Sequence, residues 1–204
     1  MAAGKNVLML GPLGNYLGYM ESFIHLWDYD YISKIAKTIR GLDINRVLVD
    51  VARADGYTGI EFGSAENFSF DQDFDLILAP DLIEHLGRPL DCLECCSRAL
   101  RPGGLIVMET PNPIGIDTLL SALIAGDRRC LPEHTCWIDA YNAAELARRA
   151  NLIMTVEAYT PINAYSALMR MRTHLFGLLR EFDQNWGLNL YFGLGEIASD
   201  LRIA

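Results

Sequence analysis

The stretch FDLILAPDLIEHL, residues 74–86, decides the fold. It opens with an apolar run that is typical of a buried strand, and Asp81, Glu84 and His85 follow it at once. An open α/β sheet binds its ligands at the carboxyl ends of its strands, where polar residues are needed. The stretch therefore predicts a strand over 74–79 that runs into a binding site.

Strands and helices alternate along most of the chain. We expect strands within residues 7–10, 39–45, 58–68, 74–79, 104–111, 152–159 and 189–198. We expect helices before the second strand and over 45–56, 89–100 and 142–152. This alternation predicts an α/β fold with a doubly wound, mostly parallel seven-stranded sheet that helices cover on both faces.

Two of these helices have an expected apolar face. Ile32, Ile35, Ala36 and Ile39 recur at helical spacing, which predicts one helix through this segment. Val47, Val51 and Ala54 are expected to form the buried face of the next, which Gly56 ends.

Composition limits the classes of protein. The chain has 204 residues, of which 51% are hydrophobic, and no linker divides it, so we predict a single domain over 1–204. Its 17 Lys and Arg against 26 Asp and Glu give a net charge of −9, so nucleic acid is not expected as a partner.

Neither a membrane span nor a metal centre is predicted. Gly11 and Pro12 cut short the first apolar run, and no later run is long enough to cross a bilayer. Five cysteines, an odd number, fit the reducing cytoplasm better than a disulfide framework. Cys92, Cys95 and Cys96 fall at helical spacing, so we expect core residues there and no metal ligands.

Polar residues after four strands are expected to meet at one rim of the sheet. Asp43, after the second strand, can accept hydrogen bonds from both hydroxyls of a ribose, and the alternative is that it caps the following helix. For Glu84 the preferred prediction is structural, a capping arrangement with Asp81 at a helix start. His85 is expected to be a packed, hydrogen-bonded side chain.

Five blocks in order resemble the class I S-adenosylmethionine-dependent methyltransferases, particularly those acting on small molecules. They are GLDIN (41–45), GSAENFSF (63–70), FDLILAPDLIEHL (74–86), RALRPGGLIVMETPNP (98–113) and HTCWIDAYNAAELARRANL (134–152). The resemblance implies a last strand that runs antiparallel and a methyl donor, S-adenosylmethionine, lying across the rim and leaving as S-adenosylhomocysteine.

The resemblance also implies a set of donor contacts. Asp43 matches the residue that holds the ribose, Ala65 and Glu66 match the stretch along the adenine, and the segment 79–81 matches the methionine end. The cofactor-binding residues expected on this basis are Gly11, Asp43, Ile44, Ser64, Ala65, Glu66, Ala79 and Asp81.

The first strand departs from the family pattern. Met9 stands where an acidic residue is usual, and GPLGN (11–15) replaces a turn richer in glycine. This departure motivates an alternative function, a methyltransferase-like binding or scaffold protein without catalysis. A nicotinamide-dependent oxidoreductase is a further alternative, but its Gly-x-Gly-x-x-Gly turn is absent.

The expected reaction is methyl transfer to a small molecule or to a glycan or lipid precursor. His134, in a loop on the rim side, is the candidate base for the acceptor's proton, and a structural loop histidine is the alternative. Segments 12–31, 113–135 and 160–187 are predicted lids that select the acceptor. The last of them is also a candidate homodimer contact.

Overall fold

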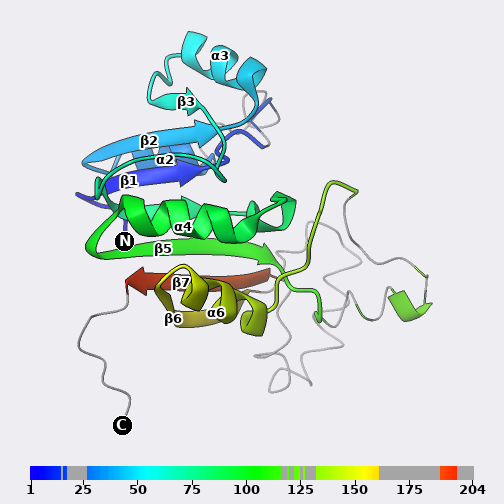
Figure 1. The fold of residues 1–204 in the computed structure, drawn as a ribbon. Helices are drawn as coiled ribbons and strands as arrows, with labels where there is room; N and C mark the ends of the chain where they lie inside the picture. Colours follow the sequence, from blue (N-terminus) through cyan, green and yellow to red (C-terminus); the bar gives the residue numbers. More distant parts are fainter. Residues whose placement is uncertain are drawn as a thin grey trace.

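The computed structural model describes residues 1–14, 16–17, 27–115, 119, 122–124, 126, 132–160 and 189–196. A seven-stranded sheet in the order β3-β2-β1-β4-β5-β7-β6 forms its centre (Figure 1). The strands are β1 (Asn6–Leu10), β2 (Thr38–Asp43), β3 (Ile60–Phe62), β4 (Phe74–Ala79), β5 (Leu100–Pro111), β6 (Leu152–Thr160) and β7 (Asn189–Glu196).

All neighbouring strands from β3 to β5 pair in parallel, whereas β7 pairs antiparallel with both β5 and β6. The arrow of β7 accordingly points opposite to those of β1, β2 and β5 in Figure 1. The predicted doubly wound, mostly parallel sheet is confirmed, and so is the antiparallel last strand that the family resemblance implied.

Helices lie on both faces of the sheet. They are α2 (Asp28–Ser33), α3 (Arg46–Ala54), α4 (Pro89–Ala99) and α6 (Ala140–Arg149), with a 3-10 helix, η2 (Ile83–His85), after β4. In Figure 1, α4 and α6 lie in front of the sheet and α2 lies behind it. Cys92, Cys95 and Cys96 are buried in the core on α4, as predicted.

The residues of β1 divide the core between the two faces. Leu8 and Leu10 pack in the cluster that α4 and α6 cover, while Met9 packs with residues of α2 and α3. All three side chains are buried. Because successive side chains of a strand point to opposite faces, the part of a central strand that is covered on both sides must be apolar, as residues 7–10 of β1 are.

The helix predicted through Ile32, Ile35, Ala36 and Ile39 is wrong in its second half. The helix α2 ends at Ser33, and Ile39 belongs to β2. The N–H groups of residues 37 and 38 donate to the carbonyl of Lys5, at 2.9 and 3.3 Å, which draws this segment into the sheet. Pairing with β1 therefore makes this segment a strand, although its apolar residues recur at helical spacing.

The predicted apolar face of α3 is wrong as well. Val47 is 71% exposed and Val51 37%, whereas Val49 and Ala52 are buried against the cluster around Met9. The helix begins after Asn45, whose side chain accepts a hydrogen bond from the N–H of Leu48. Because α3 begins at this residue and packs against Met9 of β1, the face that carries Val49 and Ala52 is the buried one.

The order of the strands reverses between β1 and β4, because the chain passes from β1 toward β2 and β3 and later returns to β4. Gly11 makes the turn after β1 with φ +65°, and its N–H donates to the carbonyl of Leu42 at 2.9 Å. The indole of Trp27 donates to the carbonyl of Pro12 at 2.7 Å. These bonds hold the turn beside the carboxyl end of β2.

The structure describes about half of the predicted lid segments 12–31 and 113–135, and only residue 160 of the segment 160–187. The single domain over 1–204 stays a prediction. No helix in the described ranges is long and apolar enough to cross a bilayer.

Gly11→Ala is expected to destabilise the protein by about 1–2 kcal/mol, because an L-residue resists the left-handed conformation. An added Cβ would also lie 3.0 Å from Cδ1 of Leu82. Gly14→Ala is the matched control, since nothing lies within 4 Å of its Cβ position. Urea unfolding of both variants measures the difference, and equal stabilities would contradict the role assigned to Gly11.

A second prediction concerns Asp75, whose carboxylate accepts hydrogen bonds from the N–H of Asn6 at 2.8 Å and from Arg101 at 3.3 Å. The bond from Asn6 lowers the pKa of Asp75 below 3.8, and Arg101 adds to this. A lowered folded-state pKa stabilises the protein above the unfolded pKa, and that contribution is lost as the pH falls through the folded value.

Asp75→Asn is therefore expected to lower the free energy of unfolding by about 1 kcal/mol at neutral pH. The difference from the wild type should shrink as the pH falls below 3.8. Denaturant unfolding between about pH 7 and about pH 3 tests this, with the exposed Asp73→Asn as control. A difference that grows in acid would contradict it.

Candidate functional site

A cavity of about 340 Å³ opens at the carboxyl ends of β1, β2 and β4, beside the reversal of strand order. Its volume suits a small organic ligand or cofactor. Seven of the eight predicted cofactor-binding residues line it, namely Gly11, Asp43, Ile44, Ser64, Ala65, Glu66 and Asp81. Ala79 does not line it and is buried in the core at the end of β4.

Asp43 lies at the end of β2 and is 7% exposed. Its Oδ2 accepts a hydrogen bond from the N–H of Leu13 at 2.9 Å, and its Oδ1 accepts one from the N–H of Asn45 at 2.9 Å. The helix cap is Asn45 itself, so the alternative reading of Asp43 as the cap is wrong. Each carboxylate oxygen retains a second lone pair for a ligand in the cavity.

The segment from Ser64 to Asn67 forms a closed turn on the opposite wall of the cavity. The Ser64 hydroxyl accepts a hydrogen bond from the N–H of Glu66 at 3.2 Å. The carboxylate of Glu66 accepts a hydrogen bond from the N–H of Arg88, next to the start of α4. Glu66 therefore fixes this wall to the helix, whatever its role toward a ligand.

The predicted capping role of Glu84 is wrong. No side chain caps η2, and Glu84 is only 2% exposed. Its Oε2 instead accepts a hydrogen bond from the Thr110 hydroxyl at 2.9 Å. The end of β5 brings Thr110 beside the turn, where the N–H of Asp81 also donates to the carbonyl of Glu109 at 3.0 Å. The carboxylate of Glu84 therefore binds Thr110, which is distant in the sequence, and does not cap the 3-10 helix.

Glu84, His85 and His134 lie together. The two imidazole rings meet edge to face with their centroids 4.7 Å apart. Ligand atoms of the three side chains lie within 4.8 Å of one another. The N–H of Thr135 donates to the carbonyl of Glu84 at 2.8 Å, which attaches the loop of His134 to η2. Sequence reasoning singled out His134 but could not associate it with residues 49 and 50 positions earlier.

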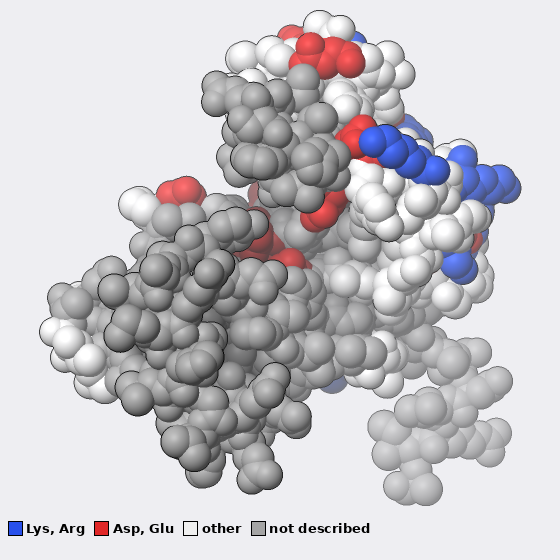
Figure 2. All heavy atoms as spheres, turned by 180° about the vertical axis from the view of Figure 1, so that it is seen from behind, with Lys and Arg blue, Asp and Glu red and all other residues white. Residues whose placement is uncertain are grey.

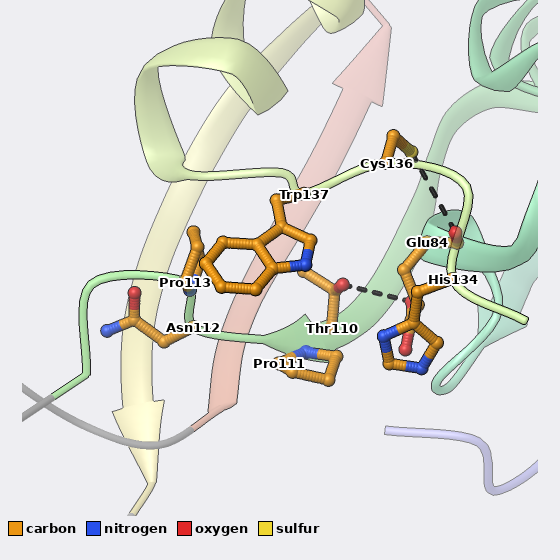
Figure 3. A pocket seen from close by; sticks show the side chains of 8 residues that line it. All are labelled: Glu84, Thr110, Pro111, Asn112, Pro113, His134, Cys136 and Trp137. Atoms are coloured by element: carbon orange, nitrogen blue, oxygen red, sulfur yellow. Dashed lines mark hydrogen bonds between the residues drawn. The ribbon is translucent and has the colours of Figure 1, made fainter. Parts of the chain in front are cut away.

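A second, smaller pocket of about 20 Å³ adjoins this cluster. Figure 3 shows the imidazole of His134 beside the carboxylate of Glu84, with the Trp137 ring and Asn112 further along the wall. His85 and Asp81 line the large cavity, whereas Glu84 and His134 line the small pocket. The cluster therefore forms part of the wall between the two.

The surroundings shift the pKa values of these groups. Burial raises the pKa of Glu84, and burial together with the nearby Glu84 raises that of Asp81. Burial lowers the pKa of His134, and the neighbouring His85 lowers it further. The imidazole is therefore neutral at pH 7 and has a free lone pair.

Figure 2 shows the side of the molecule opposite to that in Figure 1. Acidic side chains lie in a hollow near the centre of this view, and basic side chains lie toward its edge.

The chain is similar to known methyltransferases. A family model described as a methyltransferase domain matches residues 27–108. A ubiquinone biosynthesis O-methyltransferase of Thiobacillus denitrificans is 25% identical over 179 residues, covering 78% of this chain and 71% of that protein. An enzyme of the same name from Vibrio parahaemolyticus is 27% identical over 144 residues, covering 65% and 55%. The chain thus spans little more than half of the second relative.

The fold has counterparts among solved structures. An S-adenosylmethionine-dependent methyltransferase of Mesorhizobium loti superposes with a TM-score of 0.59 at 18% identity. The superposition covers 95% of this chain and 91% of that one. At this identity the similarity establishes the architecture alone.

Thr110→Val is expected to lower the free energy of unfolding by about 1–3 kcal/mol, because the buried carboxylate of Glu84 loses its hydroxyl donor while the volume is retained. Thr110 itself is 1% exposed. Thr58→Val, at an exposed position, is the control and should change stability by less than about 0.5 kcal/mol. Urea unfolding compares them, and an unaffected Thr110→Val would show that the bond is dispensable.

Proposed function

We propose that this chain is a class I S-adenosylmethionine-dependent methyltransferase that transfers a methyl group from S-adenosylmethionine to an oxygen of a small-molecule acceptor, which its similarity to known methyltransferases supports. The observation that carries the proposal is the cavity at the reversal of strand order, lined by seven of the residues that the family resemblance assigned to the donor. The choice of oxygen comes from the O-methyltransferases to which the chain is similar.

In this proposal the donor lies across the cavity with its adenosine toward β2. Asp43 accepts hydrogen bonds from the ribose hydroxyls, and the exposed side chain of Ile44 covers one face of the adenine. The methionine end extends toward the turn at Gly11 and toward Asp81. The donor's sulfonium and amino groups are positive, which the net charge of −9 favours.

The reacting oxygen of the acceptor is placed at the small pocket, next to the methyl group, because a volume of about 20 Å³ has room for the reacting group and not for a whole acceptor. Transfer is an in-line displacement, so positioning the acceptor oxygen close to the methyl carbon supplies most of the rate enhancement. Exclusion of water from the pocket contributes the rest. That His134 removes the acceptor's proton stays a prediction, which its lowered pKa and its place in this pocket support.

The scaffold alternative depended on the altered turn after β1. Met9 is buried in the core, so the missing carboxylate does not leave a gap. Gly11 keeps the left-handed conformation that lets the backbone reach the cavity rim. No similar protein reported above supports a scaffold role, and the match to a methyltransferase domain argues against the nicotinamide alternative.

The place of action and the assembly state remain proposals. We place the protein in the cytoplasm, which its odd number of cysteines favours. The candidate homodimer contact falls almost wholly outside the described residues. Neither proposal affects the chemistry assigned to the cavity.

Calorimetric titration with S-adenosylmethionine and S-adenosylhomocysteine tests the proposal. Asp43→Asn is expected to weaken binding of both about 10- to 100-fold, because a charge-assisted bond to the ribose is worth about 1.5–3 kcal/mol. Asp50→Asn, at an exposed position of α3, should bind as the wild type does.

A second variant distinguishes a direct loss of donor binding from an effect of misfolding. Asp43 also holds two backbone N–H groups, so its substitution could act through the fold. Ile44 is 71% exposed, and Ile44→Ala should leave the thermal midpoint unchanged while weakening donor binding up to about tenfold. Failure of the wild type to bind either ligand would overturn the methyltransferase proposal.

A further inference from the structure

We propose that Glu84, His85 and His134 bind a divalent first-row transition metal ion in the wall between the two pockets. Their ligand atoms lie within 4.8 Å of one another. In a tetrahedral site with bonds of about 2.1 Å, neighbouring ligand atoms are about 3.4 Å apart. Rotation of the three side chains therefore has to bring their ligand atoms closer by up to about 1.4 Å to close around the ion.

The chemistry of the three side chains suits such an ion. Imidazole nitrogen favours zinc, iron, nickel and copper over magnesium and calcium, and two imidazoles with one carboxylate leave coordination positions open. The Oε2 of Glu84 receives the Thr110 hydroxyl at 2.9 Å, which orients the carboxylate and leaves Oε1 for the ion. Hydrogen bonds of this kind from outside the ligand set typically strengthen metal binding.

The burial of Glu84 is a second, independent reason to place a cation at this cluster. Glu84 is 2% exposed, and the charged groups that act on it are His85, which favours the carboxylate, and Glu109 and the nearby Asp81, which oppose it. A buried carboxylate among further carboxylates is costly unless a positive charge offsets it. A bound cation next to His85 and His134 would supply that charge.

The position of the ion assigns it a role that rests on the proposed methyl transfer. His85 and Asp81 line the donor cavity, and Glu84 and His134 line the small pocket, so the ion lies between donor and acceptor. An acceptor hydroxyl bound to an open position loses its proton to water more readily, because the ion stabilises the oxyanion.

The transfer then balances without another reactant. A lone pair of the metal-bound oxyanion forms the new bond to the methyl carbon, and the S–CH₃ bond breaks with its electron pair going to sulfur. S-adenosylhomocysteine leaves as a neutral thioether. Binding the ion uses the lone pair of His134 that a base would need, so the ion replaces the predicted base.

Titration of chelator-treated protein with Co²⁺, followed by visible absorption, tests the site. The wild type is expected to bind one Co²⁺ per chain with ligand-field bands. His134→Ala, on a half-buried loop residue, should weaken binding at least about tenfold. Glu133→Gln changes the exposed neighbouring carboxylate and is the matched control, which should bind as the wild type does. Glu84→Gln keeps the volume of the buried side chain and should also weaken binding.

The outcomes separate the two proposals. No Co²⁺ bands in the wild type, or wild-type binding by both His134→Ala and Glu84→Gln, would overturn the metal site. Circular dichroism and the thermal midpoint establish that each variant is folded. Calorimetry with S-adenosylmethionine on the metal-free protein is read separately, because donor binding without Co²⁺ binding leaves the methyltransferase proposal standing. Co²⁺ binding without donor binding would leave only the metal site.

Discussion

The buried carboxylate of Asp43 is the interaction on which the candidate site depends. It joins the N–H of Leu13, in the loop after β1, to the N–H of Asn45, at the start of α3. These two loops form adjoining walls of the cavity. Because the carboxylate is held by backbone groups on both sides, its orientation is set before any ligand arrives, which reduces the ordering cost of binding.

A second buried carboxylate plays a different part. Glu84 is held by Thr110 from β5 and lies beside two imidazoles, one of them on a loop that follows β5. Asp43 thus organises the region assigned to the donor, and Glu84 organises the region assigned to the acceptor. The cluster around Glu84 lies where the two pockets adjoin, which is where methyl transfer would require chemistry beyond positioning.

Local sequence predicted the parts of the fold that short-range physics controls. Continuous apolar runs within β1 and β4 identified these two strands, since the part of a strand that is covered on both faces must be apolar. Where the prediction was wrong, a distant contact prevailed. Pairing with Lys5 drew Ile39 from the expected helix into β2, and packing against Met9 buried Val49 in place of Val47.

The sequence by itself determined the α/β class and the order of strands and helices, and its family resemblance indicated seven residues that line the cavity. They lie together because residues that follow parallel strands converge at one edge of the sheet. The tertiary structure alone decided the role of Glu84 and its association with His134. These residues are brought together by β5 and by the loop bond of Thr135, and no pattern of neighbours along the chain encodes a contact across fifty residues.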